Sequence, residues 1–160
     1  MSTKAERKAE GERTVFALFA QAMNWPSDER LIQSRQEPEP DILYDSANGK
    51  TAFELVENCS DVVAHNIRQL LDGKGKTVIN VSDPTRDVIK KKIGKKYESH
   101  YPIELLCYTN GRIVTPNDVA ICRIRTLLQS SRRVPFRRLW YFGKNNFVEL
   151  VWERLTDIDP

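Results

Sequence analysis

A short polar turn between two apolar runs constrains the fold more than any other feature of this chain. Residues 45–50, with Asn48-Gly49 near their centre, separate Ile42–Tyr44 from the alternating segment Thr51–Cys59. Asn-Gly accepts the positive φ angles of a tight hairpin turn, and alternating apolar and polar residues are typical of a half-buried strand. The sequence therefore predicts a β-hairpin from about Asp41 to Cys59.

Helical and extended segments alternate along the rest of the chain. Helices are expected over about Glu6–Asn24, Asp61–Leu71, Pro84–Lys92 and Thr115–Ser130, from apolar spacing and from capping residues. Strands are expected over Leu31–Arg35, Thr77–Val81, Tyr101–Tyr108, Phe136–Phe142 and Asn146–Glu153. This order predicts an α/β fold, a mixed sheet flanked by helices, in a single domain covering residues 1–160.

The distribution of apolar residues indicates a cytoplasmic protein. No apolar run approaches the roughly 18 residues that cross a bilayer, so no membrane association is expected. The charged segment Met1–Arg13 lacks the apolar stretch of a secretory signal.

The hairpin carries two acidic residues on neighbouring strands. Asp41 precedes the first strand and Glu54 lies in the second, so that the turn brings their carboxylates together. Carboxylate oxygens are the ligands that Mg²⁺ prefers, and a bound Mg²⁺ can activate water for phosphodiester hydrolysis. Two other interpretations stay open: Asp41 as a turn acid after proline, and Glu54 as an exposed strand residue.

The segments Pro40-Asp41-Ile42-Leu43-Tyr44 and Thr51-Ala52-Phe53-Glu54-Leu55-Val56 resemble the motif of the PD-(D/E)XK nuclease-like superfamily. The resemblance implies a restriction-endonuclease-like core and a metal-dependent endonuclease that hydrolyses the phosphodiester bonds of DNA. It also implies Mg²⁺, or Mn²⁺, held by Asp41 and Glu54, with Glu12 of the preceding helix as a third ligand.

The chain departs from that motif at one position. Val56 stands where the family has a lysine, and valine can neither orient water nor stabilise negative charge. Lys50, just before the strand, is the candidate for the missing catalytic cation, beside Asp41 and Glu54. The alternative is a catalytically inactive nuclease fold that serves as a nucleic-acid-binding or protein-interaction module.

Positive charge is concentrated in the second half of the chain. Between Pro84 and Lys144 there are 14 Lys and Arg residues against 4 Asp and Glu residues. Such arrays neutralise phosphates, so nucleic acid is the expected partner, DNA in preference to RNA; a solvated face and a homodimer stay open. The candidate phosphate-binding residues are Lys91, Lys92, Lys95, Arg123, Arg132, Arg133 and Arg137.

Overall fold

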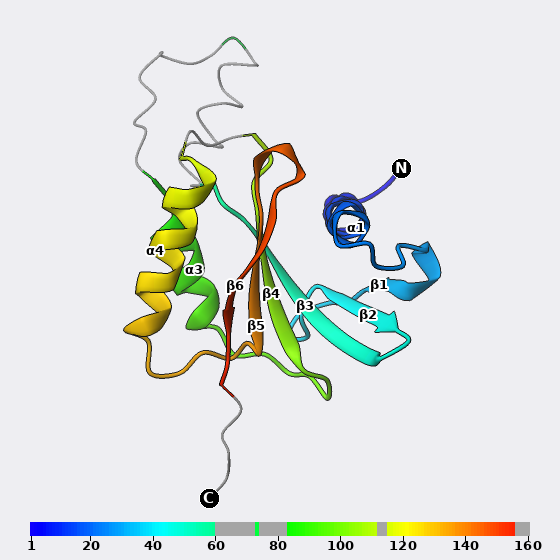
Figure 1. The fold of residues 1–160 in the computed structure, drawn as a ribbon. Coiled ribbons are helices and arrows are strands. Elements are labelled where there is room, and N and C mark those ends of the chain that lie inside the picture. The colour runs from blue at the N-terminus through cyan, green and yellow to red at the C-terminus, as the bar shows by residue number, and fades with distance from the viewer. Residues whose placement is uncertain (60–72, 74–82, 112–114, 156–160) are drawn as a thin grey trace, which may run out of the picture.

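Six strands form one mixed sheet in the order β1-β2-β3-β4-β5-β6 (Figure 1). The computed structural model describes residues 1–59, 73, 83–111 and 115–155. Pairing is parallel between β3 and β4 and between β4 and β5, and antiparallel at the other three junctions. The strands are β1 (Ile32–Ser34), β2 (Ile42–Ser46), β3 (Gly49–Glu57), β4 (Ile103–Tyr108), β5 (Arg138–Phe142) and β6 (Val148–Glu153).

The hairpin of β2 and β3 forms where the Asn-Gly turn predicts it. Gly49 has a φ of 111°, which a residue with a side chain rarely adopts. The Ser46 hydroxyl donates to the Gly49 carbonyl at 3.0 Å, and Ile42 pairs with Phe53 further along the ladder. The predicted hairpin is confirmed.

Helix α1 (Lys4–Ala22) covers one face of the sheet. The hydroxyl of Thr3 accepts a hydrogen bond from the Glu6 amide, and the Glu6 carboxylate accepts one from the Thr3 amide, which together form a capping box. The buried side of the helix carries Phe16 and Phe19, which pack on the aromatic side chains of β2, β3 and β5. The helix predicted over about Glu6–Asn24 is therefore confirmed, with bounds about two residues earlier in the chain.

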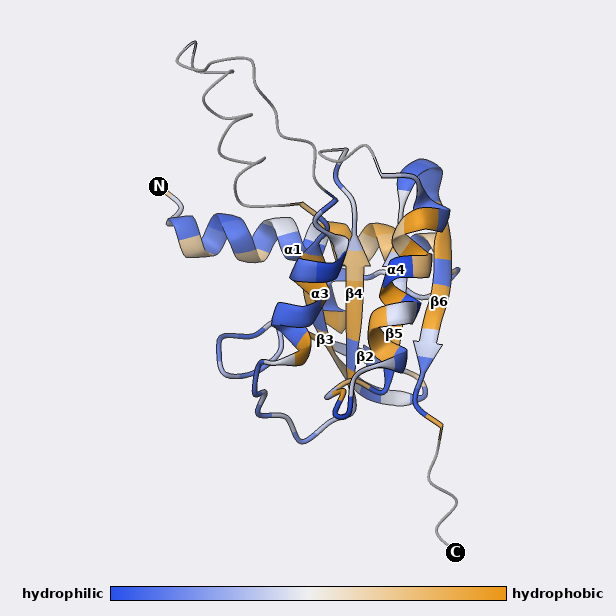
Figure 2. Ribbon diagram, turned by 90° about the vertical axis from the view of Figure 1, so that its left-hand side faces the viewer, coloured by the Kyte–Doolittle hydropathy of each residue, from blue (hydrophilic) through white to orange (hydrophobic). Residues whose placement is uncertain are grey.

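Helices α3 (Thr85–Ile93) and α4 (Asn117–Gln129) cover the opposite face (Figure 1). Ile89 of α3 and Ile124 of α4 are fully buried against Leu105 of β4 and Leu139 of β5. Figure 2 shows hydrophobic residues concentrated on β4 and on parts of α4, whereas α3 is largely hydrophilic. Two 3₁₀ turns, η1 (Glu29–Leu31) and η2 (Lys144–Asn146), precede β1 and β6.

The helices on both sides of a mixed sheet confirm the α/β class that the element order predicts. Two of the expected elements, the helix over Asp61–Leu71 and the strand over Thr77–Val81, lie outside the described residues. Among the helices that are described, none is long and apolar enough to cross a membrane.

Candidate functional site

The hairpin register places Asp41 beside Glu54. Ile42 pairs with Phe53, so the residue before Ile42 lies next to the residue after Phe53, and residues opposite one another in an antiparallel pair share a face. Asp41 is held there because its Oδ2 accepts a hydrogen bond from the Leu55 amide at 2.9 Å. Glu54 is only 1% exposed, whereas Asp41 is half-buried.

Two lysines approach the buried carboxylate of Glu54. Its Oε2 lies 3.5 Å from Nζ of Lys92 and 3.6 Å from Nζ of Lys95. Lys92 is in the last turn of α3, which ends at Ile93, and Lys95 follows just beyond the Gly94 cap of this helix. Lys95 also forms an ion pair with Glu37 at 2.7 Å. Two cations of the chain itself therefore offset part of the negative charge of Glu54.

The surroundings of Glu54 favour its protonated form. Burial raises the pKa of its carboxyl, the adjacent Asp41 raises it further, and Lys92 acts in the opposite direction, which together give a pKa of about 7. Tyr97 donates its hydroxyl hydrogen to the Lys92 carbonyl at 3.1 Å. Burial and the charge of Glu54 raise the pKa of Tyr97, so this phenol stays neutral. The site thus holds a carboxyl group that titrates near neutrality.

Glu12 reaches Asp41 from the other side of the sheet. It lies on α1 and forms an ion pair with Lys8 at 3.4 Å, one helical turn earlier. Burial raises the pKa of Glu12, and the negative charge of Asp41 adds to that shift. A groove of about 420 Å³ runs along this side, and Lys8, Glu12, Glu37 and Asp41 contribute to its wall.

The predicted catalytic lysine does not belong to this site. Lys50 is exposed at the start of β3, roughly 13 Å along the strand from Glu54. Its Nζ lies over the ring of Tyr101, 5.9 Å from the ring centre. Val56 is buried in the core beneath α3 and α4. Lys50 lies apart from Asp41 and Glu54, because the strand carries it away from them, and its action together with them stays a prediction.

The three predicted metal ligands do not converge as a set. Asp41 interacts with both glutamates, but Glu12 comes from α1 and Glu54 is paired to lysines of the α3 side. Across the described part of the chain, no group of three His, Cys, Asp or Glu side chains could hold a metal ion. The predicted three-carboxylate metal site therefore finds no support in this arrangement.

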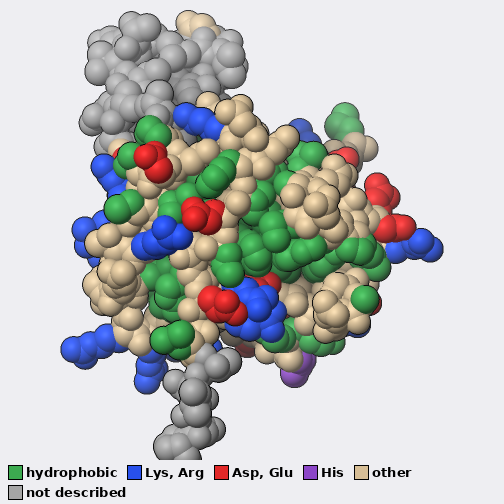
Figure 3. All heavy atoms as spheres, viewed as in Figure 1, with side chains coloured by type: hydrophobic (Ala, Val, Ile, Leu, Met, Phe, Trp, Pro, Cys, Tyr) green, Lys and Arg blue, Asp and Glu red, His purple; other side chains and the backbone are tan. Residues whose placement is uncertain are grey.

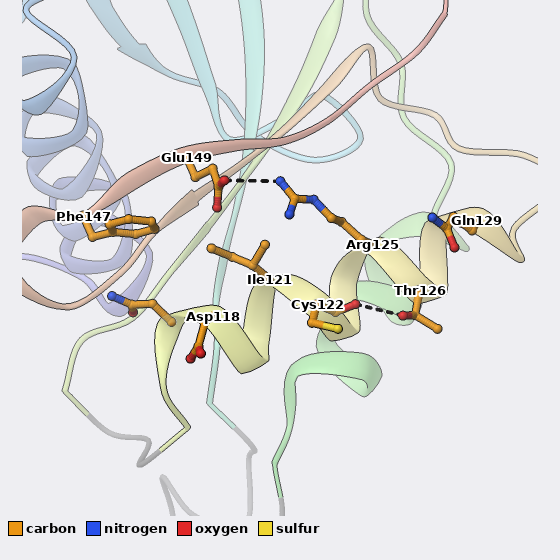
Figure 4. A pocket seen from close by; sticks show the side chains of 9 residues that line it. Asp118, Ile121, Cys122, Arg125, Thr126, Gln129, Phe147 and Glu149 are labelled. Carbon is orange, nitrogen blue, oxygen red and sulfur yellow. Dashed lines mark hydrogen bonds and ion pairs between the residues drawn. The ribbon is translucent and has the colours of Figure 1, made fainter.

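Most of the predicted phosphate-binding residues are engaged in ion pairs. Lys92 and Lys95 contact Glu54, Arg123 contacts Asp83, and Arg137 lies 3.5 Å from Glu104. In the groove between α4 and β6, about 700 Å³ in volume, Arg125 pairs with Glu149 at 3.3 Å (Figure 4). These pairs reduce the positive charge that the sequence assigns to the second half of the chain.

Three predicted phosphate contacts stay on the surface. Lys91, Arg132 and Arg133 are exposed. Binding of nucleic acid through these three residues stays a prediction, as does association into a homodimer.

Comparison with known proteins gives one weak structural similarity. No family model matches the chain, and no curated protein matches it. A solved structure of a protein of unknown function from Pseudomonas aeruginosa strain PAO1, described as belonging to the monooxygenase superfamily, is similar. The two share 17% identity and a TM-score of 0.48, over 92% of this chain and 73% of that chain. Similarity at this level assigns no function to this chain.

The comparisons nevertheless correct the family prediction. The matched structure is described as a monooxygenase-superfamily protein and not as a nuclease, and no nuclease family model matches. The assignment to the PD-(D/E)XK superfamily is wrong, and with it the prediction of a DNA-binding, magnesium-dependent endonuclease. The restriction-endonuclease-like core is not confirmed.

The sequence does not reveal the true partners of Glu54. The sequence indicates Lys92 and Lys95 as phosphate contacts and gives them no acidic partner. The closeness of the two lysines along the chain, at the end of the predicted helix, is the available signal that they act together. It does not show which acidic side chain they meet.

Proposed function

We propose that this chain is an acid–base catalyst that moves a proton to or from a polar ligand through Asp41 and Glu54. The observation that carries the proposal is the pairing of the 1% exposed Glu54 carboxyl with the half-buried Asp41, in surroundings that raise the pKa of Glu54 to about 7. A catalytic acid or base works best when its pKa is near the working pH. Paired carboxyl groups in different surroundings are a common way to reach that value.

The two carboxyl groups have separate tasks in this proposal. Asp41 lines the groove and is the group that meets the ligand, while Glu54 behind it shares the proton. Lys92 and Lys95 limit the cost of a negative charge on Glu54, so that the pair can lose its proton as well as hold it. The restriction-endonuclease-like core is no part of this proposal.

A reaction that needs only a general base tests the proposal. In the ring opening of 5-nitrobenzisoxazole, a base accepts the ring C–H proton, the new electron pair forms the nitrile, and the N–O bond breaks to leave a phenolate. The rate with this protein is expected to rise with pH around a midpoint of about 7 as Glu54 ionises. Asp41→Asn and Glu54→Gln are expected to remove that rise.

Carboxyl ¹³C NMR gives an independent check that does not depend on the probe reaction. The Glu54 carboxyl should titrate near pH 7 in the unmodified protein. Glu39→Gln, which alters an exposed acid outside the site, should leave this titration unchanged. Titration of the Glu54 carboxyl below about pH 5, the range of ordinary carboxyls, would remove the basis of the proposal.

A further inference from the structure

A third groove lies at the turn end of the β2–β3 hairpin. Its volume is about 520 Å³, within the range of small-molecule sites. We call it the aromatic groove, and its defining residues are Trp25, Tyr44, Phe53, Glu104, Arg137 and Arg138. None of these residues belongs to the acid–base site.

The aromatic wall of the groove is held by ring packing and by a hydrogen bond. The indole of Trp25 is stacked on Tyr44, with ring centres 6.0 Å apart and an interplanar angle of 17°. The Tyr44 hydroxyl donates to the Pro26 carbonyl at 2.6 Å, which ties this ring to the segment that carries Trp25. Trp25 is only half-buried, so part of its ring surface is left for a ligand. Aromatic surfaces held in this way favour planar rings.

The charged side chains of the groove favour an anion. Three basic residues, Lys50, Arg137 and Arg138, line it against one acidic residue, Glu104. Arg138 is already paired, because its Nε lies 3.0 Å from Glu153 and its Nη1 lies 3.3 Å from Glu104. The guanidinium of Arg137 has fewer hydrogen-bond and ion-pair partners than that of Arg138.

The guanidinium of Arg137 has more N–H donors than there are acceptors around it. Its Nη2 lies 3.5 Å from Glu104, and within the described residues its buried Nε has no acceptor. The side chain is 40% exposed, so its outer nitrogens are accessible from the groove. Glu104 is 2% exposed and is shared with Arg138, which leaves it unable to satisfy Arg137 alone. A guanidinium in this state is suited to a carboxylate or a phosphate.

We infer that the aromatic groove binds a planar aromatic anion, with the ring beside Trp25 and the anionic group on Arg137. Figure 3 shows one face of the molecule, on which hydrophobic side chains gather centrally with acidic and basic side chains nearby. The same combination of an apolar surface and a few convergent polar groups characterises ligand sites in general.

Calorimetric titration with 2-naphthoate tests the inference. Two matched probes separate its parts: 2-naphthamide keeps the rings without the charge, and cyclohexanecarboxylate keeps the charge without the rings. The anionic aromatic probe is expected to bind more tightly than either by roughly tenfold, the effect of one charge-assisted hydrogen bond or ring contact. Equal affinity for 2-naphthoate and 2-naphthamide, or no binding of 2-naphthoate, would overturn the inference.

Variants locate the binding in the groove. Arg137→Gln is expected to weaken 2-naphthoate binding roughly tenfold, and Trp25→Leu roughly fivefold. Arg132→Gln, which removes an exposed arginine outside the groove, and Glu54→Gln, in the acid–base site, should bind as the unmodified protein does. Near-ultraviolet circular dichroism identifies any variant that fails to fold. If folded Arg137→Gln binds 2-naphthoate as tightly as the unmodified protein, the probe does not bind at Arg137. That result would overturn the inference that the aromatic groove is the binding site.

Discussion

The buried carboxylate of Glu54 lies 3.5 Å from the ammonium nitrogen of Lys92, on the side of the sheet that α3 covers. Lys92 is 21% exposed and Glu54 is 1% exposed, so the pair is screened much less than a surface ion pair. This relationship explains how a carboxyl group can be buried here and still ionise. It also makes the stability of the protein dependent on pH.

Replacing Lys92 by methionine should raise the pKa of Glu54 above about 7, because the nearby ammonium favours the carboxylate. The variant is expected to lose roughly 1–3 kcal/mol of unfolding free energy at about pH 8, where Glu54 is ionised. The loss should be smaller at about pH 5, where Glu54 is protonated. Urea denaturation at the two pH values measures both. Lys91→Met, on the exposed side of α3, is the control, and equal losses for Lys92→Met at both pH values would contradict the prediction.

Glu54→Gln should change the dependence of stability on pH. The folded pKa of about 7 is above the ordinary value of 4.5, so the folded state binds this proton more tightly than the unfolded state. The resulting stabilisation is fully present below about pH 4.5 and is lost as the pH rises through about 7. The unmodified protein should therefore lose roughly 3 kcal/mol relative to Glu54→Gln across this range. The measurement is the free energy of unfolding of both proteins as a function of pH. If the two curves run parallel, Glu54 is not the group that makes stability depend on pH.

Arg125→Ala should expose the outer edge of the sheet at β6. The pairing of β5 and β6 is irregular between Leu139 and Trp140, and Arg125 donates its Nε–H to the nearby Val151 carbonyl at 3.2 Å. Irregular pairing and charged side chains are common means of preventing strand edges from associating. The variant is expected to self-associate more strongly in analytical ultracentrifugation. Arg132→Ala serves as the control, and a sedimentation profile of Arg125→Ala matching that of the unmodified protein would contradict the prediction.

Gly143→Ala should destabilise the connection between β5 and β6. A Cβ atom there would lie 2.2 Å from Asn117 Oδ1 and 2.8 Å from the ring of Tyr141. Asn117 cannot move freely, because its Oδ1 accepts a hydrogen bond from the Lys144 amide at 3.1 Å. The expected loss is roughly 1–3 kcal/mol.

Gly11→Ala is the matched control for that substitution. Gly11 lies inside α1, and a Cβ atom there meets nothing within 4 Å. Alanine is the better helix former, so this variant should gain roughly 0.5–1 kcal/mol. Thermal unfolding compares the two variants directly. Similar shifts in the same direction would contradict the packing argument for Gly143.

Short-range sequence patterns predict the described helices and strands of this protein well. The Asn48-Gly49 turn defines the hairpin, because only a few residue types accept its backbone angles. The apolar spacing of Phe16 and Phe19 defines α1, because its period matches the helix. Asp41 and Glu54 become neighbours through the hairpin register alone, so the sequence is sufficient to bring them together.

The tertiary structure decides which acidic and basic side chains form ion pairs. Lys92 meets Glu54 only because α3 packs over β3, and Arg137 meets Glu104 only because β4 and β5 are parallel neighbours. Sequence alone describes these cations as a basic surface suited to phosphates. The chain itself determined which segments are helices and strands, since those preferences act over a few residues. Only the packing of distant segments decided which charges are compensated, because ion pairs depend on distance in space rather than along the chain.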